Sequence, residues 1–317
     1  MRKETKLIGL IVAAVVVGGT PLSATAQAER GFTQLDTTVR LDRGGAVDLS
    51  LISGRIRVTG WDRPDVKVSA SIESGLLRFS ANSSRVELSV DDSNGDGRRG
   101  RHHNVGDARF DVSVPRGSRL ILEAVSGDIT ARGSQGEIEA SSVSGDVDVT
   151  DGARSVNVES VSGSAHAAQV NGNLRIETVS GDCRAEGVSG DVGASSVSGS
   201  IRLAGIKSKD VRSETVSGDI VYTGSIEPAG RYAFESHSGT LRLNIPRGAG
   251  AQFSVETFSG DLDTDFPVTI QPGGGRRREG RVEFTIGDGR ARVTAQTFSG
   301  RIIINNGSDS TTRRDDE

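Results

Sequence analysis

Apolar and polar residues alternate along most of this chain, and the alternation is broken at regular intervals. Between residues 125 and 199 the phrase Val-Ser-Gly recurs with glycines at positions 127, 145, 163, 181 and 199, a constant period of 18, and Gly190 falls halfway between the last two. Each interval divides into two similar halves, and each half is long enough for one short strand and one turn. Alternation with a period of two indicates half-buried strands, and a fixed repeat of about 20 residues is typical of a solenoid. The pattern predicts an all-β fold, a parallel β-solenoid (β-helix or β-roll) with two short strands in each coil of about 18–21 residues.

The register of the repeat identifies the residues that face the core. In the first regular coil the alternation points Ile129, Ala131, Ile138 and Ala140 inward. A shift by one full period places an apolar residue at every inward position of the next three coils, whereas a slip by a single position would turn every side chain to the wrong face. These further positions are Val147, Val149, Val156, Val158, Ala165, Ala167, Leu174, Ile176, Cys183, Ala185, Val192 and Ala194.

The repeated phrase reads as the corner of a coil. We expect its valine to plug the core and its glycine to relieve crowding at the bend. The serine and the aspartate that follows several of the glycines are expected to bind backbone amides of the turn. Larger residues replace small ones in the later coils, which predicts a core that widens toward the C-terminus.

The start of the chain has the features of a secretory signal peptide. Basic residues precede a short apolar run, and small residues lead to an Ala-x-Ala site that ends at Ala28. An uncleaved anchor is the alternative, but an apolar run of about 12 residues is shorter than the ~20 needed to span a bilayer. We therefore expect residues 1–28 to be removed, with no transmembrane segment afterwards.

The remainder divides into three predicted parts. Residues 29–115 are expected to form irregular β coils that cap the solenoid, with a mobile loop at 91–108. Residues 116–306 form the regular repeats, interrupted by a loop at 267–281. The polar residues 307–317 are expected to be a disordered tail.

Charge and composition narrow the function classes. Residues 1–28 hold three of the 38 basic and one of the 42 acidic residues, so the rest of the chain has a net charge of −6. This argues against a nucleic-acid binder, which usually presents a basic face. Cys183 is the one cysteine of the sequence and excludes an internal disulfide. Its inward position predicts an inert core residue rather than a reactive thiol.

Several segments together resemble one known family. They are residues 47–49, 53–58 and 60–63, the Val114-Pro115-Arg116-Gly117 entry, and the repeated Val-Ser-Gly-Asp phrase. In these segments the chain resembles the bacterial β-strand-repeat domain family of unknown function, whose members carry the label "putative adhesin". The resemblance covers about residues 32–305. It implies an exported or envelope-associated β-solenoid, and it supplies no catalytic residues. An insertion at 91–107 and a tri-arginine loop depart from the family pattern.

The aspartates after the corner glycines are candidate metal ligands. Stacked in successive coils, they would form a calcium ladder of Asp128, Asp146, Asp182, Asp219 and Asp261. The Gly-Gly-x-Gly-x-Asp signature of calcium-binding nonapeptide arrays is missing, however. We favour the reading in which these carboxylates accept hydrogen bonds from turn amides, and we expect no cofactor. His102 and His103 are adjacent and have no further spaced ligand, which makes a metal site there a weaker alternative.

We predict a non-catalytic exported β-solenoid that serves cell-envelope adhesion, interaction or scaffolding. Its partner would be an envelope protein or a glycan, and its location the periplasm, the outer cell surface or the extracellular space. One alternative is a polysaccharide-active β-helix enzyme, which needs paired carboxylates and aromatic platforms. Another is a calcium-binding β-roll. If function is local, the interruptions at 91–107 and 271–281 are the predicted places.

Overall fold

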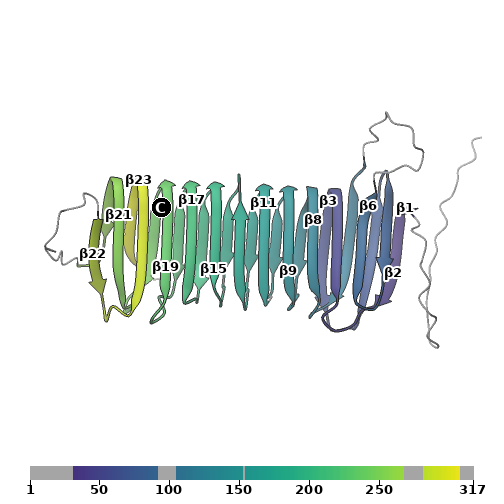
Figure 1. The fold of residues 1–317 in the computed structure, drawn as a ribbon, viewed down its shortest axis with the longest axis horizontal. Coiled ribbons are helices and arrows are strands. Elements are labelled where there is room, and N and C mark those ends of the chain that lie inside the picture. The colour runs from purple at the N-terminus through teal and green to yellow at the C-terminus, as the bar shows by residue number, and fades with distance from the viewer. Residues whose placement is uncertain (1–30, 92–104, 153, 268–280, 308–317) are drawn as a thin grey trace, which may run out of the picture.

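The computed structural model describes residues 31–91, 105–152, 154–267 and 281–307, which form strands and no helix. The all-β prediction is confirmed. Figure 1 shows these strands side by side in one long rod, with the N-terminal strands at one end. The strands are β1 (Gly31–Phe32), β2 (Gln34–Arg40), β3 (Ala46–Trp61), β4 (Asp65–Ile72), β5 (Leu76–Ala81), β6 (Arg85–Asp91), β7 (Ala108–Pro115), β8 (Arg119–Arg132), β9 (Glu137–Ser144), β10 (Val147–Thr150), β11 (Ser155–Ser162), β12 (Ala165–Ala168), β13 (Asn173–Thr178), β14 (Cys183–Glu186), β15 (Val192–Ser198), β16 (Ile201–Ile206), β17 (Asp210–Ser217), β18 (Ile220–Gly224), β19 (Arg231–Ser238), β20 (Leu241–Pro246), β21 (Ala251–Thr264), β22 (Arg281–Ile286) and β23 (Ala291–Gly307).

Strands two apart in the chain pair in parallel through the middle of the rod. Even-numbered strands form one row, in which Val147 of β10 lies opposite Ile129 of β8 and Ala165 of β12. Odd-numbered strands form a second row, in which Val156 of β11 lies opposite Ile138 of β9. The partners in each of these pairs are separated by one period of the sequence repeat. Each repeat therefore contributes one strand to each row.

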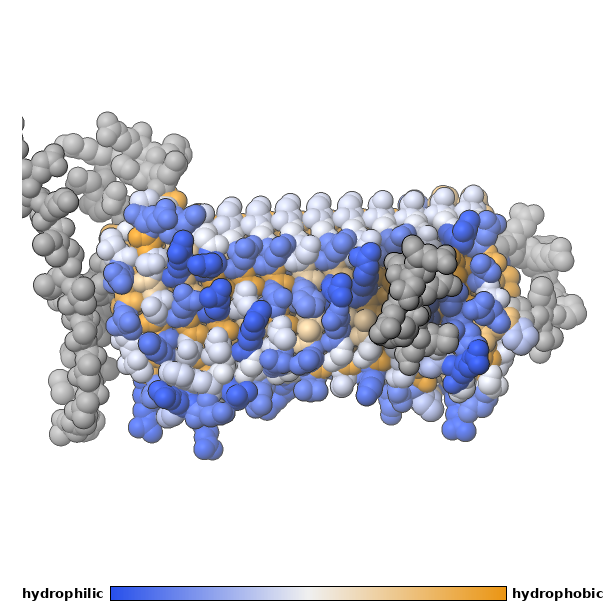
Figure 2. Space-filling view, turned by 180° about the vertical axis from the view of Figure 1, so that it is seen from behind, coloured by the Kyte–Doolittle hydropathy of each residue, from blue (hydrophilic) through white to orange (hydrophobic). Residues whose placement is uncertain are grey.

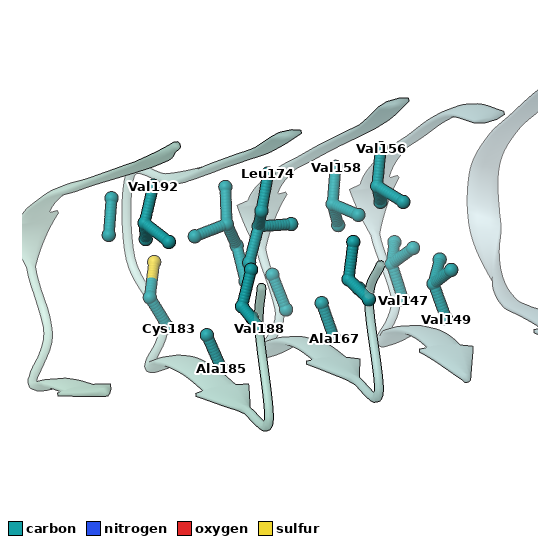
Figure 3. Close-up of a cluster of buried hydrophobic side chains, with 14 of the residues drawn as sticks. Val147, Val149, Val156, Val158, Ala167, Leu174, Cys183, Ala185, Val188 and Val192 are labelled. Carbon is teal, nitrogen blue, oxygen red and sulfur yellow. The ribbon is translucent and has the colours of Figure 1, made fainter. Parts of the chain in front are cut away.

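The core lies between the two rows. Each inward residue predicted for the four regular coils is buried, at 3% exposure or less. Figure 3 shows side chains from both rows, such as Val149 and Val158, pointing into the space between them. The alanines at 165, 167 and 185 keep this core thin. Tyr222, Tyr232 and Phe234 are also fully enclosed, so the predicted widening toward the C-terminal coils is confirmed.

The corner glycines permit the close approach of successive coils. A Cβ on Gly145 would lie 2.2 Å from the carbonyl oxygen of Gly127, and a Cβ on Gly163 would lie equally close to the carbonyl of Gly145. Real Cβ atoms essentially never approach within 3.0 Å of such an atom. The predicted role of the glycine at the bend is confirmed, and its cause is the backbone of the neighbouring coil.

The order of the coils in space differs from the order in the chain at both ends of the rod. At one end β3 is inserted between β8 and the pair β6 and β7. At the other end β23 pairs with β19 and β20 on one side and with β21 on the other, although β21 precedes β23 in the chain. Residues 46–61, predicted to be part of irregular coils, therefore join the regular stack through thirteen matched positions of β8.

Antiparallel strands occur at the two ends. Near the N-terminus β2 pairs with β4, β4 with β7, β5 with β6, and β1 with β5. At the opposite end β22 pairs antiparallel with β21. The predicted signal peptide, most of the loop at 91–108, nearly all of the loop at 267–281 and the tail after residue 307 lie outside the described residues. Within the described part, no helix has the length and hydrophobicity to cross a membrane.

Candidate interaction surface

The valine of each Val-Ser-Gly phrase at a repeat boundary lies on the surface of the rod, where it is 44–51% exposed, whereas Val188 of the additional mid-coil copy is buried. The prediction that the boundary valines plug the core is wrong. At the corner, alternation gives way to two consecutive outward residues, the valine and the serine after it. Because the coils pair in register, equivalent valines follow one another at the strand spacing of about 4.8 Å. This valine row consists of Val125, Val143, Val161, Val179, Val197 and Val216.

A hydroxyl residue immediately before each valine from Val143 onward takes the inward position. The Oγ of Ser142 donates to the carbonyl of Gly127 at 3.0 Å, and the Oγ of Ser160 donates to the carbonyl of Gly145 at 3.1 Å. A valine at this position would leave the corner carbonyls without these donors, which is costly inside a protein. The hydroxyl row is Ser142, Ser160, Thr178, Ser196, Thr215 and Ser236, and each of its members is buried.

Most of the five candidate calcium ligands form hydrogen bonds with the backbone of a neighbouring coil. Four of them accept a backbone N–H from the next coil; for example, the Oδ1 of Asp146 accepts from Ser164 at 2.8 Å, and the Oδ1 of Asp182 accepts from Ser200 at 2.8 Å. Asp128 and Asp219 make the same contact with Asp146 and Thr240. Asp261 lies opposite Arg301 of β23. Among the described residues no cluster of three His, Cys, Asp or Glu has the geometry of a metal site.

Cys183 is buried, and its Sγ lies 3.3 Å from the Oγ1 of Thr178. Burial raises the pKa of the Cys183 thiol to about 11, with smaller contributions from neighbouring acids. A thiol in this state is a poor nucleophile at neutral pH, as predicted. His102, His103 and the tri-arginine loop lie outside the described residues.

Aromatic rings continue the valine row toward the C-terminal end. His237 and Phe298 are stacked with ring centroids 4.9 Å apart, and Phe298 and Phe258 are stacked at 4.8 Å. This order requires the insertion of β23 between β19 and β21, because Phe298 comes after Phe258 in the chain. Phe258 is 78% exposed and ends the stack. These rings occupy the position of the valine in the repeated phrase, and each follows a hydroxyl residue (Ser236, Thr257 and Thr297), as the members of the valine row from Val143 onward do.

Glutamates form a parallel outward row two residues before the valines and rings. Glu159 lies in register with Glu177, and Glu214 lies in register with Glu235. Gln296 follows Glu235 in this row, and Glu256 follows Gln296. Acidic side chains at the strand spacing repel one another in the absence of a counter-charge.

The two outward rows and the hydroxyl row between them line a groove of about 670 Å³ at the C-terminal half of the rod. One wall is apolar and runs from Val197 through His237 to Phe258 and Phe298. Figure 2 shows the general character of one long face of the rod, on which hydrophobic residues reach the surface between hydrophilic ones. The groove combines apolar contact with carboxylates, a combination suited to binding. Its lining residues are Thr178, Ser195, Ser196, Val197, Glu214, Thr215, Val216, Glu235, Ser236, His237, Glu256, Thr257, Phe258, Gln296, Thr297 and Phe298.

Known structures include several similar chains. A putative cell adhesion protein from Clostridium sporogenes is 11% identical, covering 86% of this chain and all of that one, with a TM-score of 0.25. A putative adhesin from Bacteroides fragilis is 12% identical, with coverage of 86% and 96% and a TM-score of 0.39. A putative adhesin from Parabacteroides distasonis is 7% identical, with coverage of 86% and 97% and a TM-score of 0.35. No curated protein matches the chain.

A family model matches most of the described rod. It covers residues 37–191 in one match and residues 87–305 in a second, overlapping match. Together the matches include the strands of the valine row and those of the aromatic stack. The chain belongs to the Toastrack DUF4097 family.

Proposed function

We propose that this chain is an exported, non-catalytic parallel β-solenoid whose valine row and aromatic stack form a rigid binding surface in the cell envelope. Its role is adhesion, interaction or scaffolding, and its partner is an envelope protein or a glycan. The proposal includes removal of residues 1–28, a cap formed by residues 29–115, and a location in the periplasm, on the outer surface or outside the cell.

The continuous exposed apolar row is the observation that carries this proposal. Six valines and two phenylalanines are 44–78% exposed and follow one another from coil to coil. Isolated apolar residues on a surface are ordinary, but a contiguous apolar patch on a soluble protein is typical of an interaction site. The chain places a hydroxyl inside and a large apolar side chain outside at coil after coil. Stability of the corner alone does not require the outward residue to be apolar.

The backbone supports a rigid presentation of this row. Each coil is held by parallel hydrogen bonds to the coil on either side, and the aspartate contacts add a side-chain bond between coils. A preorganised surface loses little conformational freedom when a partner binds. A solenoid of this kind therefore suits display of a long surface better than the closure of an active site.

A binding experiment with envelopes tests the proposal. Fluorescently labelled protein starting at residue 29 would be added to envelopes prepared from the bacterium that encodes it. The variant Val161→Ser/Val179→Ser shortens the apolar row in two adjacent coils. The control His166→Ser/Arg184→Ser changes two outward residues of the same coils on another face. Circular dichroism and thermal unfolding would verify that both variants fold.

We expect saturable binding that the valine variant weakens at least fivefold and the control leaves within twofold of the wild type. Equal binding of the three proteins would contradict a role for the row. Release of sugar fragments from the envelope glycans by purified protein would contradict the non-catalytic assignment. The mass of the exported protein tests cleavage after Ala28.

A further inference from the structure

We propose that the groove at the C-terminal half of the rod binds a cationic polypeptide segment, an extended stretch in which lysines or arginines are separated by apolar residues. This inference rests on the proposed function, because it names the chemistry of the partner at one part of the same surface.

The first observation is that charge pairing differs between two glutamates in the middle of the row, Glu177 and Glu214, and those beside the aromatic stack. Glu159, nearer the N-terminus, accepts a hydrogen bond from Asn157 in place of an arginine. Glu177 forms an ion pair with Arg175, two residues earlier on the same strand. Glu214 forms the equivalent pair with Arg212, at 3.0 Å. Each of these carboxylates is therefore neutralised by a neighbour from its own coil.

The carboxylates beside the aromatic stack have lost this arginine. Ala233 stands two residues before Glu235, and Ser254 stands two residues before Glu256. In the part of the chain that the structure describes, neither glutamate has an ion pair, although Arg212 is near enough to Glu235 for their charges to interact. Arg281 of β22 lies opposite Glu256, but its guanidinium forms an ion pair with Glu283, at 2.8 Å. Two carboxylates without an ion pair thus remain for an external cation where the wall of the groove becomes aromatic.

The second observation is the aromatic stack itself. Phe298 is covered on its two faces by His237 and Phe258, with interplanar angles of 8° and 6°. Phe258 ends the stack and is more exposed than Phe298. The face of a phenylalanine ring attracts ammonium and guanidinium groups. Phe258 and Glu256 lie on the same strand, so one cation can interact with the ring and the carboxylate together.

The third observation is the spacing between the two unpaired carboxylates. Glu235 and Glu256 are both in register with Gln296 of β23, so they are two coils apart. Two coils correspond to roughly 10 Å along the rod. A segment in the polyproline-II conformation has three residues per turn and rises about 3.1 Å per residue, so every third side chain lies on the same face, about 9 Å apart. A basic residue at every third position would therefore match both carboxylates, and the apolar residues between them can contact the valine and phenylalanine wall.

Charge also disfavours a second copy of this chain as the occupant. A copy that docked through the same face would bring its own glutamate row against this one. The like charges would oppose association, whereas a cationic segment is attracted by them.

Fluorescence anisotropy with a defined peptide tests the inference. The probe is a labelled nonapeptide in which Lys-Leu-Val is repeated three times, added to protein that starts at residue 29. One control peptide carries glutamate in place of lysine, and another carries serine in place of leucine and valine. The groove variant is Glu235→Gln/Glu256→Gln. The matched control is Glu123→Gln/Glu159→Gln, which removes two charges from the same row outside the groove.

We expect the lysine peptide to bind with an affinity that falls as salt is added. The groove variant should weaken binding at least tenfold, and the control variant should change it less than twofold. Phe258→Leu, which keeps an apolar side chain but removes the ring, should weaken binding about threefold or more. Both control peptides should bind at least tenfold more weakly than the lysine peptide.

Several results would overturn the inference. They are equal binding by the groove and control variants, equal binding of the glutamate peptide, or displacement of the lysine peptide by a neutral chitin hexasaccharide. If the lysine peptide fails to bind while the valine variant still loses envelope binding, the chemistry proposed for the groove is wrong and the proposed function stands. If the lysine peptide binds and the valine variant retains envelope binding, the groove inference stands and the broader role of the row is wrong.

Discussion

Replacement of Gly145 by alanine is a direct test of how closely the coils are stacked. Gly145 has no left-handed backbone angle, so an alanine there is opposed by space and not by conformation. Its Cβ would lie 2.2 Å from the carbonyl oxygen of Gly127 and 2.6 Å from the carbonyl carbon. To reach the 3.0 Å limit of real Cβ contacts, the two coils must separate at this corner by at least about 0.8 Å.

The size of the effect follows from that separation. Overpacking of a rigid site costs roughly 1–3 kcal/mol. The hydrogen bond from Ile129 N–H to the Asp146 carbonyl, 2.9 Å long, lies next to the corner and would be stretched, at a cost of about 1 kcal/mol. Gly163 packs equally closely on the other side of Gly145, so the coil has no free direction in which to move. We expect Gly145→Ala to lower the free energy of unfolding by roughly 2–4 kcal/mol.

Gly193→Ala is the matched control, because its new Cβ would meet only the Leu174 carbonyl oxygen at 4.0 Å. It should be neutral or stabilising by up to about 1 kcal/mol, since alanine restricts the unfolded chain. Urea unfolding followed by circular dichroism measures both variants, and hydrogen exchange at residues 127–147 reports whether the loss is local, as in other repeat proteins. If Gly145→Ala is as stable as Gly193→Ala, the proposed backbone contact does not limit the coil spacing.

Further predictions concern the interior and the aspartate ladder. Thr178→Val should destabilise by roughly 1–3 kcal/mol, because it removes a buried donor to the Gly181 carbonyl. Thr297→Val should be nearly neutral in the same urea assay, because the Thr297 hydroxyl is buried without a partner among the described residues. Asp182→Ala should lower the free energy of unfolding by about 1 kcal/mol, and Asp182→Asn should lower it less. A chelator should leave the melting temperature of the wild type unchanged. A lower melting temperature on chelation would support a calcium site. The pKa of the Cys183 thiol is raised to about 11 in the folded state, so the thiol ionises first in the unfolded chain as the pH rises. The free energy of unfolding should therefore decrease between pH 9 and 11. The decrease should be smaller in the variant Cys183→Ala.

The inward residues of the regular coils were predictable from the sequence. A period of 18 and an alternation of two define a register, and only one register places apolar residues such as Ile129, Val147 and Leu174 inward together. Backbone pairing in a solenoid repeats from coil to coil, so an error in one coil would recur in all of them. This redundancy explains why the inward residues predicted for the four regular coils are all buried.

The corner could not be predicted in the same way. A pattern of Ser-Val-Ser-Gly offers the valine as the natural core residue, because burial of an apolar side chain is worth about 2 kcal/mol. At the corner the stronger requirement is a donor for the carbonyl of the preceding coil, as the bond from Ser142 to Gly127 demonstrates. Because that carbonyl belongs to another coil, the need for a donor is apparent only when two coils are stacked.

The amino-acid sequence by itself determined the all-β class, the coil length, the inward register and the need for glycine at the bend, because these follow from local alternation repeated many times. The tertiary structure decided which side chains reach the surface together. Insertion of β23 beside β21 joins Phe298 to His237 and Phe258, although a long stretch of chain separates Phe298 from both of them. Local periodicity does not predict such a pairing, because hydrogen bonds between strands that are far apart in the sequence determine it.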